Sequence, residues 1–437
     1  MKNYVKIALI AFVALSLMSL LSLFLLARTT GSTVSAGRAE IQSAGDKVVY
    51  TEYATPPLPE RHNAFYYLMR LKPYSDAFEQ RLLANGEGTS SDLIPAGQQI
   101  SPTVLKGLGD IVDETEEGFS LLSQAATAHG FRSEIDHSLG YGVLLTHGSL
   151  FRSAGRMLGA RSIVLASRDQ GDDALRTCID GLKLQQLVST EPMIVQWLMA
   201  LSIQDQMLEA AHHVLVSTST SDSVRDELDA VLASIDNQAG LVNALKAERA
   251  IGLLTFDQMR QGNVGEGVAA TPLPGFLTSS WIGQAYLNDD EAAYIRIMNQ
   301  LIELVGKPRT ERTFLEEELF AELSDDGFRK VVTKMTVPAL SQVVPVQEST
   351  DTKLRCLRIA LRIQDQAEVD LESIPLAIRT DPVSRKPLIV ARRPEGWLVY
   401  GVGENGKDDG GDFAKDPSRN APFDIGFAPS LVPTSTD

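Results

Sequence analysis

The feature that most constrains this chain is an apolar run close to its N-terminus. Residues 7–27 read IALIAFVALSLMSLLSLFLLA and contain no charged side chain. A helix of about 20 apolar residues is long enough to span the hydrocarbon core of a bilayer. Lys2 and Lys6 precede the run, and positive charge tends to keep such an end in the cytoplasm. The sequence therefore predicts a single-pass protein of the inner (cytoplasmic) membrane, with its N-terminus cytoplasmic and its body on the periplasmic or outer side.

A cleaved secretory signal is the alternative interpretation of the same segment. Val34-Ser35-Ala36 supplies the small residues that a signal peptidase site requires. The apolar part of a signal peptide is usually about 7–15 residues long, whereas this run is longer and is followed by Arg28. We therefore favour an uncleaved anchor formed by residues 1–28. Both interpretations place the rest of the chain outside the cytoplasm.

The segment after the anchor has the composition of a spacer. Residues 29–60 are mostly small and polar, and they end in Pro56-Pro57-Leu58-Pro59. Closely spaced prolines favour an extended, semi-rigid chain. We therefore predict a Pro-rich linker over residues 29–60.

The charge balance limits the classes of partner. The chain carries 56 Asp and Glu against 40 Lys and Arg, a formal net charge of −16. Nucleic-acid binding requires clustered positive charge that replaces phosphate counterions, and only 6% of residues are aromatic and able to stack on bases. We expect no nucleic-acid partner. The partners that we expect are the membrane and other envelope proteins.

The body of the chain has helical periodicity. Val224, Leu228, Val231 and Ile235, for example, recur at the spacing of one apolar helix face. We find no fixed period over the three or more units that a repeat array needs. The prediction is a mainly α fold, in which residues 61–350 form an irregular helical bundle or a short α-solenoid. The helices predicted there are residues 63–71, 77–83, 111–129, 150–168, 174–188, 191–216, 224–235, 243–259, 295–305 and 315–323.

The pattern changes near the C-terminus. An apolar stripe predicts a last helix over residues 352–368, and two short apolar segments around Pro394-Glu395-Gly396 predict a β-hairpin of residues 388–393 and 397–402. The tail from Asp416 is rich in proline and is expected to be irregular. Residues 351–437 are therefore predicted to form a small module of a helix and a β-hairpin.

Motifs in this module resemble the end of type II secretion major pseudopilins, which have an Asp-Pro turn, a short hairpin and a Gly/Asp loop after a long helix. The matching motifs are Asp381-Pro382, Lys386-Pro387-Leu388, Gly396-Trp397-Leu398-Val399-Tyr400 and the loop from Gly403 to Gly411. The match covers about residues 352–412. With its anchor and helical body, the whole chain resembles a group of membrane-anchored envelope proteins that share this ending.

The Gly/Asp loop is the candidate metal site. Glu404, Asp408, Asp409 and Asp412 offer hard oxygen ligands at short spacing, and the neighbouring glycines allow backbone carbonyls to turn inward, as calcium requires. The resemblance also implies calcium, because the matching loop of pseudopilins can hold it. The alternative is a solvated acidic turn whose aspartates accept hydrogen bonds from their own backbone.

Other motifs do not predict nucleotide binding or catalysis. Residues 401–406 match G-x-G-x-x-G, but a phosphate site needs a helix starting at once, and the acidic residues from Asp408 onward would repel pyrophosphate. Adjacent His212 and His213 would point in different directions on a helix, and no histidine pair has metal-ligand spacing. Cys178 and Cys356 are expected to be buried thiols, with a disulfide as the alternative.

Because no catalytic constellation is recognisable, the sequence predicts a non-enzymatic envelope protein with a structural or protein-interaction role. Two alternatives remain open. One is a secretion-associated, pseudopilin-like component, suggested by the C-terminal motifs. The other is an envelope hydrolase whose carboxylates come together only in the fold, as glycoside hydrolases place two acids across one cleft.

Overall fold

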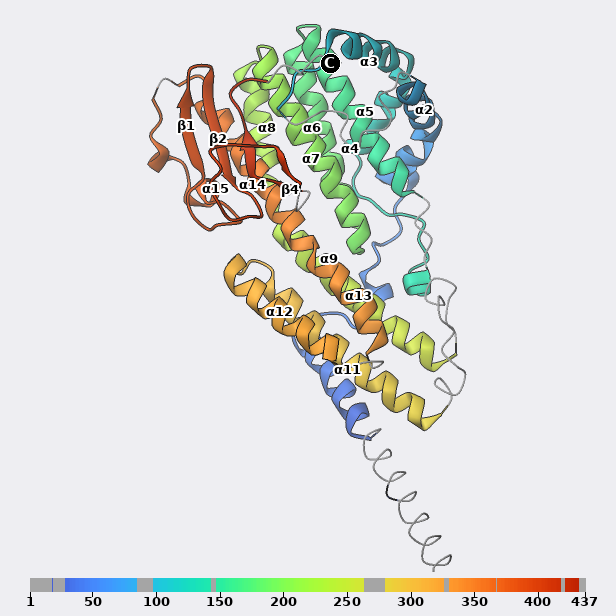
Figure 1. Cartoon of the computed structure of the whole chain (residues 1–437). Coiled ribbons are helices and arrows are strands. Elements are labelled where there is room, and N and C mark those ends of the chain that lie inside the picture. The colour runs from blue at the N-terminus through green and yellow to red at the C-terminus, as the bar shows by residue number, and fades with distance from the viewer. Residues whose placement is uncertain are drawn as a thin grey trace, which may run out of the picture. The chain divides into compact units, whose positions relative to one another are not determined.

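The computed structural model describes Met18 and residues 28–84, 97–142, 147–262, 280–325, 330–366, 368–417 and 421–431. These residues are mainly helical with a small antiparallel sheet near the C-terminus, which confirms the predicted fold class at that level (Figure 1). Contacts between residues divide the chain into two compact units. Unit 1 comprises Met1–Ala54, Ile135–Leu144 and Val242–Gln342, and unit 2 comprises Thr55–Glu134, Leu145–Leu241 and Val343–Asp437. This division crosses the predicted domain boundaries at residues 60 and 350.

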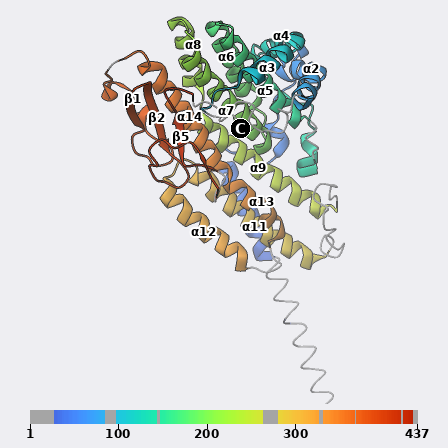
Figure 2. The same cartoon turned by 45° about the horizontal axis from the view of Figure 1, so that its top comes forward.

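The helical part of unit 2 is organised around α5, α6 and α7, which lie side by side (Figures 1 and 2). Gly181 on α6 faces Met207 on α7, and a Cβ there would lie 2.3 Å from the Met207 sulfur. Glycine therefore permits the close approach of these two helices. The helices of this part are η2 (Glu60–His62), α2 (Ala64–Ala84), α3 (Pro102–Glu114), α4 (Glu116–Ala126), α5 (Gly148–Ser167), α6 (Gly171–Val188), α7 (Ile194–Ser217) and α8 (Asp222–Ser234).

Several predicted helix boundaries in unit 2 differ from the structure. The last predicted helix, residues 352–368, is α14 and runs from Val343 to Ile363. The predicted helices 63–71 and 77–83 are, apart from Asn63, parts of one helix, α2, which continues through Pro73. The predicted helix 111–129 is instead divided between α3 and α4. The division lies at Thr115, whose hydroxyl donates to the Ile111 carbonyl at 2.8 Å. A threonine hydroxyl that bonds locally to the backbone competes with the regular helix pattern.

The C-terminal part of unit 2 is a helix packed on a sheet. Helix α14 (Val343–Ile363) lies against β2 (Gly396–Val402) and β5 (Asp424–Phe427) (Figure 2). Strand β1 (Ile389–Arg393) pairs with β2 in an antiparallel hairpin, and β2 pairs on its other side with β5. The predicted hairpin is confirmed. The remaining elements are η4 (Leu371–Ser373), α15 (Leu376–Arg379) and the short pair β3 (Lys415–Asp416) and β4 (Ala421–Pro422).

The expectation of an irregular tail from Asp416 is wrong for part of that tail. Ile425 and Phe427 of β5 are buried in the core of the module, 2% and 3% exposed. The strand is only four residues long, so its alternation is too short to stand out from the proline-rich sequence around it. Burial of these two side chains, together with pairing to β2, stabilises the strand.

The Asp381-Pro382 turn is fixed by the side chain of its aspartate. Asp381 is 1% exposed, and its carboxylate accepts hydrogen bonds from the backbone N–H groups of Val383 and Ser384 at 3.0 and 3.1 Å. Arg355 of α14 donates to the Thr380 carbonyl at 2.6 Å. The Asp381-Pro382 turn and the bond from Arg355 therefore hold the segment before the hairpin against α14.

Unit 1 contains η1 (Tyr50–Tyr53), η3 (His137–Gly142), α11 (Trp281–Leu304), α12 (Arg309–Asp325), α13 (Val331–Ser341) and the greater part of α9 (Asn237–Arg260). It also contains a helix over residues 28–43, where the sequence predicted the start of a linker. This helix packs closely on α11, because a Cβ on Gly37 would lie 3.1 Å from Ile295. Among the residues that the structure describes, no helix has the length and apolarity needed to cross a bilayer. The predicted anchor at residues 7–27 lies outside them, apart from Met18.

Ion pairs explain why residues 28–43 are part of the folded unit. Arg38 donates to Glu291 of α11 at 2.6 Å and to both carboxylate oxygens of Asp257 of α9 at 2.8 and 3.0 Å. The Glu291 side chain is fully buried and also pairs with Arg260. A buried carboxylate requires such partners, so the helix that supplies Arg38 completes the charge balance of the unit 1 interior.

Candidate functional site

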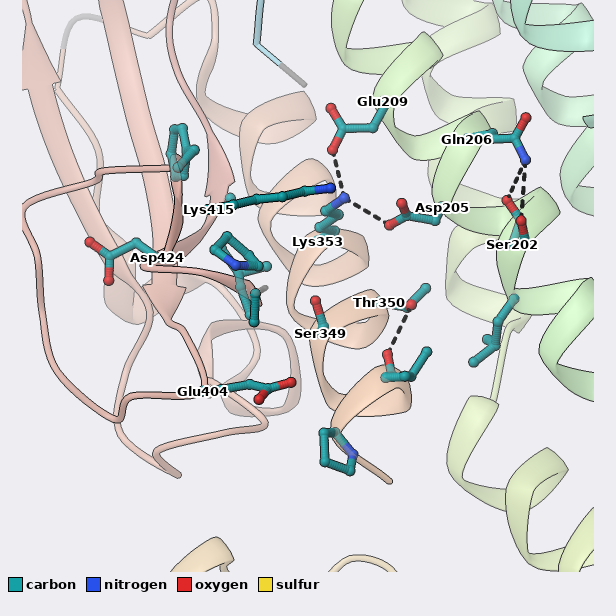
Figure 3. A pocket seen from close by; sticks show the side chains of 18 of the residues that line it. Ser202, Asp205, Gln206, Glu209, Ser349, Thr350, Lys353, Glu404, Lys415 and Asp424 are labelled. Atoms are coloured by element: carbon teal, nitrogen blue, oxygen red, sulfur yellow. Dashed lines mark hydrogen bonds and ion pairs between the residues drawn. The ribbon is translucent and has the colours of Figure 1, made fainter. Parts of the chain in front are cut away.

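The candidate site is a cavity of about 420 Å³ within unit 2. Its volume lies in the range of about 300–1,000 Å³ that is usual for small-molecule sites. Two walls are helix faces, from α7 and α14, and the third is formed by the loops and strand β5 of the C-terminal module (Figure 3). The cavity therefore depends on three segments that are far apart in the sequence.

Each helical wall follows the spacing of one helix face. Leu198, Leu201, Asp205 and Glu209 of α7 line the cavity at intervals of three or four residues, which places their side chains on one side of the helix. On α14 the lining residues include Val346, Ser349, Thr350 and Lys353. On both helices the apolar residues come earlier in the sequence and the charged ones later. The cavity is thus partly apolar and partly charged.

A buried ion cluster forms the charged part. Lys353 contacts Asp205 at 2.8 Å and Glu209 at 2.7 Å, and the side chains of Lys353 and Glu209 are only 16% and 8% exposed (Figure 3). Burial opposes the charge on Lys353, but the two carboxylates outweigh it and raise the pKa of Lys353 above its ordinary value. Lys353 consequently remains an ammonium group and is unsuited to act as a general base.

Arg156 of α5 is a second buried cation in the lining. It pairs with Glu79 of α2 at 2.6 Å, and Glu79 also accepts a hydrogen bond from Ser153 at 2.9 Å. The Nε and Nη2 groups of Arg156 are buried and form no hydrogen bond within the described residues. The charge of this guanidinium is therefore balanced by Glu79, from outside the cavity.

The third wall is held in place by Asp424. One carboxylate oxygen of Asp424 accepts hydrogen bonds from the N–H groups of Asp409 and Gly411 at 3.0 and 2.8 Å. Burial raises the pKa of Asp424. Its partners come from the Gly/Asp loop, so Asp424 connects that loop to β5 at the edge of the cavity.

Glu404 differs from the other acidic residues of the lining. It is half-buried and, across the described part of the chain, forms no hydrogen bond or ion pair. In Figure 3 its carboxylate points toward α14, on which Ser349 lies. The carboxyl group of Glu404 is therefore available to a ligand.

The other three predicted calcium ligands are used within the loop. Asp408 accepts from the Tyr400 hydroxyl at 2.9 Å and from the Gly410 N–H at 3.0 Å. Asp409 accepts from the Asn405 amide at 2.6 Å, and Asp412 accepts from the Ala414 N–H at 2.9 Å. Within the described ranges, no three His, Cys, Asp or Glu side chains are grouped so that they could hold a metal ion. The bonds to Asp408 from Gly410 and to Asp412 from Ala414 are of the kind expected for an acidic turn that accepts from its own backbone.

The G-x-G-x-x-G match has a structural explanation. Gly401 lies in β2, and a Cβ on it would lie 2.9 Å from the Asp381 carboxyl carbon. Gly403 follows the strand, and a Cβ there would lie 2.3 Å from the Phe423 carbonyl oxygen. No helix begins after Gly406, where the chain continues as bends and irregular backbone to Ala414. The glycines therefore serve close packing, and the geometry of a phosphate loop is absent from this described segment.

The cysteines and the histidine pair have structural surroundings. Cys178 and Cys356 are both buried and free, so the expectation of buried thiols is confirmed and the disulfide alternative is wrong. Burial raises the pKa of Cys178 to about 12, which makes it a poor nucleophile. His212 stacks on Phe427 with ring centroids 4.5 Å apart, and its Nε2 lies 2.8 Å from the Ala428 carbonyl oxygen.

Sequence reasoning identified Glu404 but missed the rest of the cavity. Asp205, Glu209 and Lys353 have no motif spacing, because the contact between α7 and α14 is tertiary. The only sign of these residues in the sequence is a charged residue on an otherwise apolar helix face. This pattern also occurs on many solvated helices, so it does not identify a cavity. Comparisons with protein-family models, curated proteins and solved structures give no significant match to this chain.

Proposed function

We propose that this protein is a membrane-anchored envelope protein with a structural or protein-interaction role, whose body lies on the periplasmic or outer side. The observation that carries the proposal is the helix over residues 28–43. It follows the apolar run directly and is tied into unit 1 through Arg38, Asp257 and Glu291. The folded body would then begin at the membrane surface without a flexible spacer.

Charge pairing around the cavity supports a binding role over catalysis. Asp205 and Glu209 share the Lys353 ammonium group, and Glu79 neutralises Arg156. A general acid and base pair requires two groups that exchange protons near the working pH. Carboxylates that pair with a cation are kept in one charge state. Such groups are suited to form a binding surface and not to transfer protons.

Crosslinking in native membranes tests the interaction role. A photoreactive residue in place of Phe314, which is 67% exposed on α12, should capture a discrete envelope protein. The same residue in place of Gln300, which is exposed on α11, is the control for random capture. Equal, diffuse labelling from both positions, together with turnover of an envelope polymer by the purified protein, would contradict the proposal.

A second candidate is a secretion-associated, pseudopilin-like component. The observation that favours it is the packing of the long helix α14 on an antiparallel sheet built from the predicted hairpin. Crosslinks from Arg393, at the exposed end of β1, to secretion components would support this role. Crosslinks from Arg393 that contain none of these components would count against it.

A further inference from the structure

We propose that the cavity between α7, α14 and the C-terminal module binds an amphipathic cation, an ammonium or guanidinium group carried on an apolar body. The cationic group would lie between Glu404 and Ser349. The apolar body would pack against Leu198, Leu201 and Val346. This assigns to the cavity a binding site that goes beyond the anchoring and interaction role proposed above.

The charge of the lining points to a cation. Lys353 is shared by Asp205 and Glu209, and Arg156 is paired with Glu79. Asp424 accepts two backbone N–H groups. Lys415 has an interaction of its own within the chain. The other oxygen of Asp424, Oδ1, is buried and has no hydrogen-bond partner within the described residues. Among the charged lining residues of the described chain, Glu404 is the one whose side chain forms neither a hydrogen bond nor an ion pair.

The position of Glu404 makes this charge useful to a ligand. Its side chain is half-buried and points across the cavity toward α14 (Figure 3). Ser349 on that helix forms no hydrogen bond within the described residues, so its hydroxyl oxygen can accept from an ammonium group. A charge-assisted hydrogen bond to a carboxylate is about twice as strong as a neutral one. The site can therefore distinguish a cation from a neutral molecule of the same shape.

The apolar lining explains the second half of the ligand. Leu198 and Leu201 of α7, Val346 of α14, and Phe413, Pro422 and Ile425 of the third wall offer contact area for a ring or a short chain. Burying apolar surface contributes roughly 25 cal/mol per Å². The chain also carries a net charge of −16, which attracts cations over distance. Both a free organic amine and the Lys or Arg side chain of a peptide have this chemistry.

The test is calorimetric titration of the full chain in lipid nanodiscs, with empty nanodiscs as reference. Three probes share one ring and differ in charge, namely benzylamine, benzyl alcohol and benzoate. Benzylamine should bind about tenfold or more tightly than benzyl alcohol, and benzoate most weakly, because a hydrogen bond to a charged group contributes about 1.5–3 kcal/mol. Equal affinities for the three probes, or tightest binding of benzoate, would overturn the proposal.

Substitutions test whether the probes bind in this cavity. Glu404→Gln should weaken benzylamine about tenfold and leave benzyl alcohol unchanged. Glu395→Gln, at the exposed hairpin turn, should leave both probes unchanged. Ser349→Phe should fill the cavity and abolish binding of both probes. Wild-type benzylamine affinity in Glu404→Gln, or retained binding in a folded Ser349→Phe protein, would contradict the site.

A capped Leu-Lys-Leu peptide separates the two sources of the cation. Tighter binding than benzylamine would assign the ligand to a peptide side chain, and weaker binding to a free amine. Either result supports the site only if Glu404→Gln weakens that same probe. A response to calcium alone, without any response to the cations, would overturn the proposal in favour of a metal site.

Discussion

At His212 the protein buries a titratable ring between α7 and the end of β5. Burial lowers the pKa of His212 to about 4, and the hydrogen bond to the Ala428 carbonyl only partly opposes this shift. The Nε2 atom must carry the proton that it donates to that carbonyl. The other nitrogen, Nδ1, is buried and has no hydrogen-bond partner within the described residues. Protonating the ring would therefore add a donor that lacks an acceptor.

The lowered pKa predicts acid sensitivity of unit 2. The stabilisation from neutral His212 is fully present above the unfolded pKa of about 6.5 and is lost as the pH falls toward 4. Once His212 is fully protonated in the folded state, the expected loss of unfolding free energy is about 3 kcal/mol. His212→Phe, which retains a ring beside Phe427, should show a smaller fall of unfolding free energy between pH 7.5 and 4.5. His129→Phe, at an exposed position, is the control and should behave like the wild type.

Lys353 carries a prediction for the ion cluster of the cavity. Lys353→Met would remove the cation that pairs with buried Glu209 at 2.7 Å and should lower the unfolding free energy by about 3 kcal/mol. The control is Lys183→Met, which removes an exposed ion pair with Glu227. This variant should change the unfolding free energy by about 1 kcal/mol or less. Denaturant unfolding measures both. Equal effects would show that the cluster adds nothing to stability.

At the scale of elements, apolar periodicity was enough to place α5, α6, α7 and α8 and the β1–β2 hairpin. The sequence failed where a tertiary contact decides the outcome. Residues 28–43 look like a spacer because their polar composition hides Arg38, whose partners Asp257 and Glu291 are more than 200 residues away. Asp290 is a similar case. It lies on α11, and its carboxylate accepts from the backbone N–H groups of Val332 and Thr333 at the start of α13.

The helix over residues 28–43 should loosen when its buried partner is neutralised. Glu291→Gln removes the charge that Arg38 and Arg260 share and should destabilise unit 1 by about 3 kcal/mol. Trypsin should then cleave after Arg38 faster than in the wild type. The matched control is Glu303→Gln, because Glu303 is exposed and lies on α11, as Glu291 does. Unchanged cleavage in Glu291→Gln would show that the ion pairs do not hold this helix.

The Gly/Asp loop was located correctly by its motif, whereas its chemistry depends on hydrogen bonds that the sequence does not reveal. Asp408, Asp409 and Asp412 already accept donors from within the loop. We therefore expect millimolar calcium to leave the melting temperature of the full chain unchanged. A rise that Asp408→Asn reduces would instead support the calcium site predicted from the sequence.

At the scale of the whole molecule, the chain forms two units from interleaved segments, and the proposed anchor is followed in the sequence by the helix over residues 28–43 of unit 1. Val34 and Arg38 of this helix are part of the unit 1 interior, with Val34 8% exposed. Cleavage after Ala36 would separate these two residues and remove part of that packing. This packing is the reason why we propose an uncleaved anchor rather than a cleaved signal.

The most direct measurement is a reporter enzyme that is active only outside the cytoplasm, fused after Asp437 and assayed in separated membrane and soluble fractions. We predict activity that stays in the membrane pellet after alkaline washing. Activity in the soluble periplasmic extract would show that the apolar run is removed. An inactive reporter on an intact fusion would show that the body faces the cytoplasm, and either result would contradict an outward-facing, membrane-anchored protein.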